Sequence, residues 1–107
     1  SSTLRAGLRA LTRLQATELA PHGVTVNSVL PGHTLTDRQV HLAEIRSKSE
    51  GLSIEEVLRL QAEAVPMKRL ADAKEIAAPV IFFCSQAASY ITGVNLLADG
   101  GLTKAPG

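Results

Sequence analysis

Apolar residues recur along the chain at two spacings, and these spacings predict an alternation of helices and strands. Residues 2–20 place leucines at helical intervals, which predicts an amphipathic helix ended by Pro21 and Gly23. The leucine face consists of Leu4, Leu8, Leu11 and Leu19. Three arginines four residues apart form a basic stripe on another side, where we expect a solvated face; the alternative is an interface with acidic partners. They are Arg5, Arg9 and Arg13.

Two short aliphatic segments, residues 24–29 and 94–98, are bounded by turn-forming residues and predict strands. Their low polarity indicates burial on both faces, as in a parallel sheet. Asn27 is the polar amide within the first strand and must find hydrogen-bond partners there. We therefore expect Asn27 to tie neighbouring loops together.

Three further helices are predicted between the two strands. Thr36 followed by Gln39, and Ser53 followed by Glu56, have the spacing of capping boxes and predict helices over 37–48 and 54–65. A third helix is predicted over 72–86, where Asp72 and Glu75 form the start. Pro79 lies inside it and should either kink the helix or remove one backbone hydrogen bond. The resulting order is an α/β alternation.

The predicted strands are too few for a complete sheet, because a two-stranded unit is marginal and leaves both edges open. We therefore interpret residues 1–107 as a single partial domain. Within it, we expect the two polar helices of residues 37–65 to form a helical flap that covers the substrate.

Composition indicates an ordinary globular protein and excludes several classes of partner. The chain is 45% hydrophobic and 20% charged, with a formal charge of +1, which gives no electrostatic case for nucleic acid or a membrane surface. No apolar stretch reaches the roughly 20 residues of a membrane helix, so a cytoplasmic location is expected. Cys84 lies in an apolar run and is expected to be buried. The three histidines lack metal-ligand spacing, which predicts no metal site.

Two long motifs, LAPHGVTVNSVLPGHTLTD and LADAKEIAAPVIFFCSQAASYITGVNLLADGG, carry a resemblance that extends over residues 1–101. They resemble the C-terminal part of a short-chain dehydrogenase/reductase, in particular the 3-oxoacyl-acyl-carrier-protein reductase type. The resemblance implies the C-terminal part of a Rossmann-like doubly wound parallel sheet, with about two strands and four helices present. It also implies NAD or NADP as cofactor and hydride transfer to or from a small carbonyl or hydroxyl substrate.

The family's Pro-Gly-x-aliphatic-x-Thr motif falls on the turn after the first predicted strand. It implies that Pro31, Gly32, Thr34 and Thr36 bind the cofactor, with Thr34 standing at the aliphatic position. The carboxyl end of a parallel strand faces the ligand crevice in such sheets, which agrees with this assignment. Thr36 is also interpretable as a plain helix cap. The resemblance further implies that Tyr90 is a packed aromatic residue.

The family's catalytic Tyr and Lys are separated by three residues on one helix, and this spacing places Ser1 at the Tyr position and Arg5 at the Lys position. The resemblance therefore implies Ser1 and Arg5 as the catalytic residues, with Arg5 also contacting the nicotinamide ribose. Both groups depart from the family pattern. A serine hydroxyl is a much weaker acid than a phenol, whereas arginine keeps the positive charge of lysine.

The Gly-rich phosphate loop of dinucleotide-binding proteins does not occur in this sequence. We therefore expect the isolated chain to bind a dinucleotide weakly and to be inactive alone. Association with an N-terminal half, or homo-oligomerisation, is expected because sheet edges and apolar helix faces lack partners. The alternative is a catalytically inactive fragment or degenerate paralogue that acts as an oligomerisation or interaction module.

Overall fold

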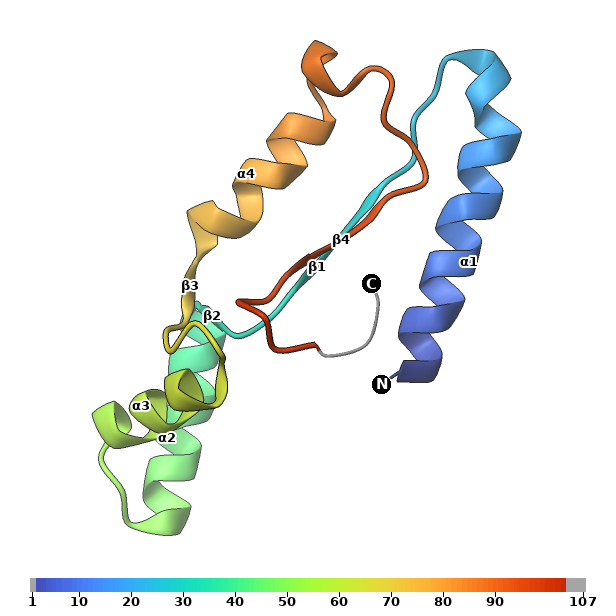
Figure 1. The fold of residues 1–107 in the computed structure, drawn as a ribbon. Helices are drawn as coiled ribbons and strands as arrows, with labels where there is room; N and C mark the ends of the chain where they lie inside the picture. The colour runs from blue at the N-terminus through green and yellow to red at the C-terminus, as the bar shows by residue number, and fades with distance from the viewer. Residues whose placement is uncertain (1, 104–107) are drawn as a thin grey trace. The chain divides into compact units, whose positions relative to one another are not determined.

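The computed structural model describes residues 2–103, and its elements follow the predicted order (Figure 1). The helices are α1 (Ser2–Leu19), α2 (Asp37–Glu50), α3 (Ile54–Ala64) and α4 (Ala73–Phe83), with short 3₁₀ turns η1 (Ala20–His22) and η2 (Gln86–Ala88). The strands are β1 (Ser28–Pro31), β2 (Thr34–Leu35), β3 (Ala71–Asp72) and β4 (Asn95–Ala98). The protein is therefore α/β, as predicted. The two-residue strands β2 and β3 were not predicted.

The described residues divide into two compact units. The first unit contains residues 2–30 and 77–97, and the second contains residues 31–76 and 98–103. The first unit thus holds α1 and most of α4, whereas the second holds α2, α3, β2 and β3.

Strands β1 and β4 pair with each other to form a two-stranded sheet. The Ser28 amide donates to the Val94 carbonyl at 2.9 Å, and the Gly32 amide donates to the Ala98 carbonyl at 3.1 Å. Both partners advance in the same direction along the chain, so the strands run parallel, as predicted. The predicted burial on both faces is wrong, because most strand residues are only half-buried and both Pro31 and Leu96 are exposed, Leu96 at 36%. A sheet of two strands buries too little of either face.

The predicted role of Asn27 is confirmed within the first unit. Its side-chain amide donates to the Ile91 carbonyl at 3.2 Å, and its Oδ1 accepts from the Val94 amide at 3.0 Å. One side chain therefore joins the approach to β1 to the turn that precedes β4. Both polar atoms of the amide are satisfied, as a half-buried amide requires.

The faces of α1 differ from the sequence-based expectation. Its buried residues are Thr12 and Ala16, and Arg5 and Arg9 lie half-buried on the same stripe of the helix. The leucine face is exposed, with Leu4 at 75%. The expectation of a solvated arginine stripe is wrong for these two arginines, because small Thr12 and Ala16 allow close packing of the helix along their side.

The close packing of α1 is visible at Gly93. A Cβ at Gly93 would lie 3.5 Å from the Ala16 Cβ, so helix and turn are in van der Waals contact there. The α1 stripe that faces its own unit is therefore the one carrying Arg5 and Arg9, with the leucines beside it.

In the second unit, α2 and α3 pack together around Ala43 and Val57, both fully buried. The predicted capping of both helices is confirmed. Thr36 Oγ1 accepts from the Gln39 amide at 3.2 Å, and Ser53 forms a reciprocal capping box with Glu56. The Gln39 side chain does not return to its cap but donates to Gln61 of α3 at 2.6 Å. This bond between helices explains why only the second box is complete.

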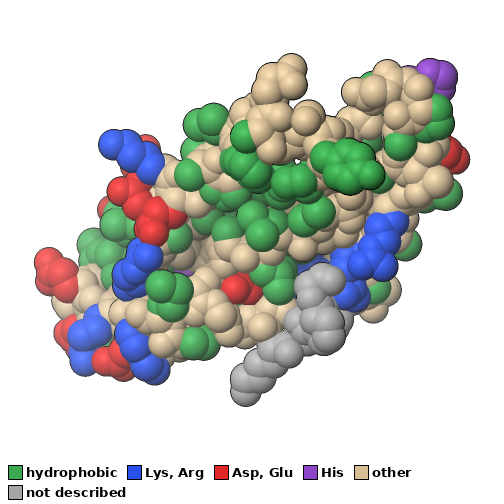
Figure 2. Space-filling view, turned by 45° about the horizontal axis from the view of Figure 1, so that its top comes forward, with side chains coloured by type: hydrophobic (Ala, Val, Ile, Leu, Met, Phe, Trp, Pro, Cys, Tyr) green, Lys and Arg blue, Asp and Glu red, His purple; other side chains and the backbone are tan. Residues whose placement is uncertain are grey.

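Two predictions of burial are wrong in the first unit. Cys84 is exposed at the end of α4, and Tyr90 is fully exposed in the turn before β4. Cys84 follows an apolar run, but the first unit contains too few elements to cover either side chain. Figure 2 shows hydrophobic side chains gathered at the surface of one face. In residues 2–103 no helix is both long and apolar enough to cross a bilayer.

Candidate functional site

Four of the predicted cofactor-binding residues lie together in the second unit. Pro31 ends β1, Gly32 follows it, Thr34 begins β2, and Thr36 caps α2. Arg5 lies half-buried on α1, which belongs to the first unit, so it is not part of the same compact unit as these four residues. Ser1 lies outside the described residues. The structure therefore brings together the residues of the segment 31–36, which we call the β1–α2 segment.

Gly32 is required by close backbone packing. A Cβ at this position would lie 2.7 Å from both the Cα and the Cβ of Asp99. Real Cβ atoms do not approach backbone atoms so closely, and Asp99 cannot move without disturbing β4. The β1–α2 segment is thus pressed against the residues that end β4.

The Asp99-Gly100-Gly101 sequence fills the other side of this contact. Gly100 has a φ of +63°, and a Cβ there would lie 2.6 Å from Val65 Cγ1. The Met67 amide donates to the Gly100 carbonyl at 3.1 Å. Three chain segments therefore meet around the end of β1, and the glycines permit their close approach.

The hydroxyl groups of the β1–α2 segment retain hydrogen-bonding capacity. Thr34 Oγ1 donates to the Gly32 carbonyl at 3.1 Å, so its oxygen can still accept. Thr36 Oγ1 accepts from the Gln39 amide, so its hydrogen can still be donated. Together they offer an acceptor and a donor next to the amino end of α2. One acceptor beside one donor fits a ligand that itself carries both kinds of group. A dinucleotide is such a ligand, because it has an amide nitrogen that donates and amide and phosphate oxygens that accept.

The β1–α2 segment is held by a short parallel ladder that sequence reasoning missed. Thr34 pairs with Ala71 and Leu35 with Asp72, which defines the β2–β3 bridge. The Ala71 amide donates to the His33 carbonyl at 2.9 Å. A two-residue strand has no measurable periodicity, so no hydrophobic pattern signals it.

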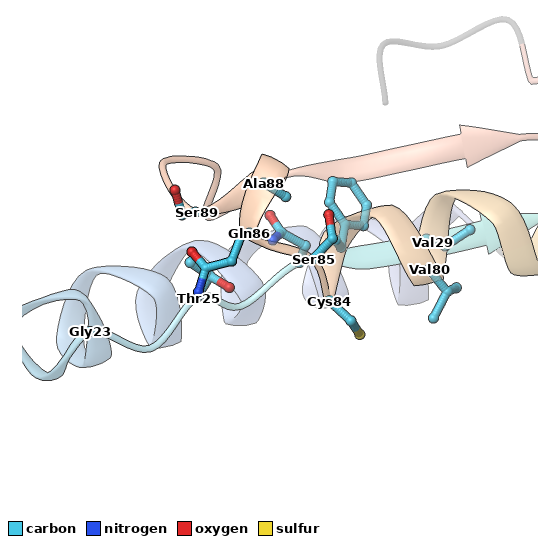
Figure 3. Close-up of a pocket in the computed structure, with 11 residues that line it drawn as sticks. Gly23, Thr25, Val29, Val80, Cys84, Ser85, Gln86, Ala88 and Ser89 are labelled. Atoms are coloured by element: carbon cyan, nitrogen blue, oxygen red, sulfur yellow. The ribbon is translucent and has the colours of Figure 1, made fainter.

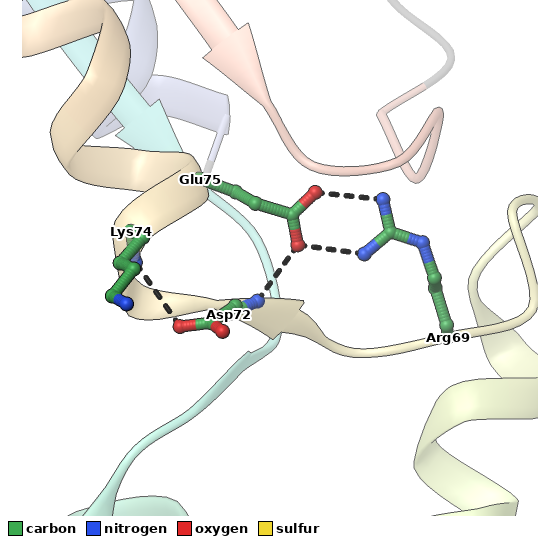
Figure 4. Close-up of polar contacts among 4 residues, drawn as sticks. All are labelled: Arg69, Asp72, Lys74 and Glu75. Carbon is green, nitrogen blue, oxygen red and sulfur yellow. Dashed lines mark hydrogen bonds and ion pairs between the residues drawn. The ribbon is translucent and has the colours of Figure 1, made fainter.

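An ion pair joins the residues on either side of β3 (Figure 4). Both terminal nitrogens of Arg69 donate to the two carboxylate oxygens of Glu75 at 2.7 Å. Glu75 also accepts the Asp72 amide at 2.9 Å, and the Asp72 side chain accepts the Lys74 amide at 3.2 Å. These last two bonds confirm that Asp72 and Glu75 begin α4. The guanidinium of Arg69, followed by the Asp72 amide, lowers the pKa of Glu75 from 4.5 to about 2.

We expect the stabilisation by Glu75 to depend on pH in one direction. Its pKa is lower in the folded protein than the ordinary 4.5, so the contribution is present above pH 4.5 and is lost as pH falls toward 2. The difference in unfolding free energy between the wild type and Glu75→Gln should therefore shrink from pH 7 to pH 2. Urea unfolding at several pH values measures it. A difference that grows on acidification would contradict the prediction.

The first unit contains an open cavity of about 560 Å³ (Figure 3). It lies along one side of residues 23–29 and the last turn of α4, and alternate residues of the strand approach face it. Its lining includes Thr25, Asn27, Val29, Phe83 and Cys84. No predicted site residue lines it, so the cavity is distinct from the β1–α2 segment. Within residues 2–103, no group of three or more His, Cys, Asp or Glu side chains is placed to hold a metal ion.

Comparison with known proteins adds independent information on this arrangement. A family model described as enoyl-(acyl carrier protein) reductase matches residues 2–103. The NADPH-dependent reductase BacG of Bacillus subtilis is 38% identical over 104 residues, which cover 97% of this chain and 40% of that protein. The 3-oxoacyl-[acyl-carrier-protein] reductase FabG of Aquifex aeolicus is 39% identical over 101 residues, covering 94% and 36%.

A solved structure agrees with the fold as well. The L-sorbose reductase from Gluconobacter frateurii, complexed with NADPH and L-sorbose, matches with a TM-score of 0.86 at 32% identity. The match covers 94% of this chain and 39% of that one. The chain thus spans less than half the length of each of these proteins. The names of the Aquifex and Gluconobacter enzymes give those two proteins different substrates.

Proposed function

The chain belongs to the short-chain dehydrogenase/reductase family, and we propose on this basis that it is the C-terminal part of an NAD(P)-dependent oxidoreductase. The proposed reaction transfers a hydride between the nicotinamide cofactor, NAD or NADP, and a small carbonyl or hydroxyl substrate. The observation that carries the proposal is the β1–α2 segment. It follows the carboxyl end of a parallel strand and presents the hydroxyls of Thr34 and Thr36 beside a helix start.

In the proposed enzyme, each residue of the site has a separate task. The bound cofactor supplies or accepts the hydride. Thr34 and Thr36 hydrogen-bond the cofactor, and Pro31 and Gly32 fix the turn that presents them. Arg5 donates hydrogen bonds to a ribose hydroxyl and adds a positive charge next to the proton-transfer position. Ser1 occupies that position.

We propose the α2–α3 pair, within residues 37–65, as the flap that covers the substrate. The pair has its own buried contacts at Ala43 and Val57, and the Gln39–Gln61 bond joins its two helices. A 3-oxoacyl group is the substrate class we place first, because the sequence resembles that reductase type and the Aquifex relative bears that name. The flap exposes apolar side chains suited to an acyl chain, among them Leu42 and Ile45.

Residues 1–107 form a single partial domain in this proposal, completed by an N-terminal half. The parallel β1–β4 pair, the open cavity beside residues 23–29 and the exposed leucine face of α1 all support a further packing partner. The relatives are more than twice as long as their matched region, which agrees with a missing half. Homo-oligomerisation would bury the remaining apolar faces.

Reconstitution tests the proposal. The chain is co-expressed with the N-terminal portion of the Bacillus subtilis relative that precedes the matched region, and NADPH oxidation is measured with a 3-oxoacyl thioester and with L-sorbose. We expect activity only when the two parts are combined, and weak dinucleotide binding by the chain alone in calorimetry. Tight NADPH binding by the isolated chain, or an inactive combined protein, would contradict the proposal.

Substitutions at Thr36 separate its cofactor contact from its capping role. Thr36→Asp keeps a good helix cap but cannot donate a hydroxyl hydrogen, whereas Thr36→Ser keeps both functions. We expect Thr36→Asp to retain the unfolding midpoint of the chain and to weaken NADPH binding by the combined protein at least about tenfold. Thr36→Ser should change neither. Normal NADPH binding by Thr36→Asp would show that Thr36 acts only as a helix cap and does not contact the cofactor.

A non-enzymatic oligomerisation or interaction module is the second candidate. It is favoured by the exposure of large apolar side chains on the first unit, where Ile81 is 68% exposed and Tyr90 fully exposed. Both candidates predict association, and light scattering should find oligomers. The reconstitution assay distinguishes them, because an interaction module stays inactive in the combined protein.

A further inference from the structure

The Arg69–Glu75 pair differs in kind from the other Arg–Glu ion pairs of the described chain. Arg46–Glu50 and Arg59–Glu63 each join residues four apart on one helix. Arg69–Glu75 instead joins the segment before β3 to the first turn of α4. Its side chains are about half exposed, 52% and 44%, and it is bidentate. A bidentate arginine contact fixes direction as well as distance.

The pair surrounds the strand that holds the β1–α2 segment. Arg69 precedes β3 and Glu75 follows it, and the same Glu75 carboxylate accepts the amide of Asp72 within β3. The segment that precedes β3 and the last residue of β3 are therefore bonded to the same carboxylate. β3 in turn carries the ladder to β2.

The β2–β3 ladder is too short to be stable by itself, because isolated two-stranded pairs are marginal even at greater length. In this ladder the Ala71 amide donates a hydrogen bond to the His33 carbonyl at 2.9 Å. One residue beyond β2, Thr36 caps α2. A displacement of β3 would therefore be transmitted through the ladder to both Thr34 and Thr36.

We propose that Arg69 and Glu75 form a positioning pair that holds His33–Thr36 in place through the β2–β3 ladder. The inference rests on the proposed function in that this segment is the one assigned to the cofactor. Arg69 and Glu75 act through β3, so neither residue needs to touch the cofactor. The low pKa of Glu75 agrees with a carboxylate that stays ionised in this role.

Amide hydrogen exchange in the full 107-residue chain tests the positioning directly. Arg69→Met removes the pair, Arg69→Lys keeps the charge, and Arg59→Met is the matched control on the exposed pair of α3. The Ala71 amide reports the ladder, the Gln39 amide reports the Thr36 cap, and the Val57 amide reports the α2–α3 packing. All three amides have defined acceptors in the structure.

We expect Arg69→Met to speed amide exchange at Ala71 and Gln39 roughly fivefold. This factor corresponds to the upper end of the stabilisation that exposed ion pairs provide. Exchange at Val57 should stay unchanged, and Arg69→Lys should restore part of the protection. Arg59→Met should leave Ala71 and Gln39 unaffected. Unchanged exchange at Ala71 would overturn the proposal, and so would an equal increase at all three amides, which indicates only global destabilisation.

The reconstituted enzyme gives a second readout that separates this inference from the proposed function. Arg69→Met should raise the KM for NADPH about fivefold and leave kcat unchanged, since the reacting groups are untouched. A fall in kcat at constant KM would overturn positioning of the cofactor segment. If the wild-type combination shows no NADPH-dependent activity, the proposed function fails, and the exchange experiment still decides whether the pair positions the segment.

Discussion

Gly32→Ala is expected to destabilise the protein by about 3 kcal/mol, a large fraction of the stability of an ordinary domain. The added Cβ would lie 2.7 Å from the Asp99 Cα, and Asp99 is anchored by the hydrogen bond between the Gly32 amide and the Ala98 carbonyl. Relief would require separating the ends of β1 and β4. Urea unfolding followed by circular dichroism measures the effect.

Gly7→Ala is the matched control, because a Cβ at Gly7 would meet nothing within 4 Å. Alanine is the better helix former, so this change should stabilise the protein by up to about 1 kcal/mol. The double change Gly32→Ala with Asp99→Gly should not restore stability, since the Asp99 Cα itself lies at 2.7 Å from the added carbon. An unfolding midpoint for Gly32→Ala equal to that of the wild type would refute the packing argument.

Ser1→Tyr combined with Arg5→Lys is expected to raise kcat of the reconstituted enzyme by about two to four orders of magnitude. This is the range that a positioned general acid or base contributes. The double change installs a phenol and an ammonium four residues apart, the spacing of one helical turn. The phenol donates a proton far more readily than a serine hydroxyl, and the nearby positive charge stabilises its ionised form.

Two further variants show whether the gain comes from this pair. Arg5→Lys alone should raise kcat only slightly, because the proton donor is still missing. Arg13→Lys makes the same change at an exposed position on the same helix and should leave kcat unaltered. Turnover in the double variant no higher than in the native chain would remove Ser1 and Arg5 from the catalytic positions.

Much of the fold could be predicted from the sequence because its signals are local. Helix caps such as Ser53 with Glu56 act over three residues, and the structure shows the bonds that the spacing predicts. The role of Asn27 could also be predicted, since a single amide in an aliphatic segment has few ways to be satisfied, although the segment becomes a strand only from Ser28. In each case, the residues that decide the structure are adjacent in sequence or chemically conspicuous.

The errors have a common physical cause, which is that burial depends on neighbours that a sequence pattern does not specify. Cys84 follows an apolar run and the family resemblance implies a packed Tyr90, yet no element in residues 2–103 covers either side chain. On α1 the leucine face was conspicuous, but the small pair Thr12 and Ala16 decides which side packs. The candidate site shows the same limit. Thr34 and Thr36 were found through a motif, whereas no motif signals the pairing of Arg69 with Glu75, which lie six residues apart.

The parallel pairing of β1 with β4 has a consequence for the order of folding. The bond between Val94 and Asn27 joins residues 67 positions apart, so it must close a long loop before it contributes any stability. The α2–α3 pair lies inside that loop and is joined by the Gln39–Gln61 bond over only 22 positions. Local contacts form faster than distant ones. The helical pair should therefore assemble first and shorten the effective loop, so the strands meet late in folding.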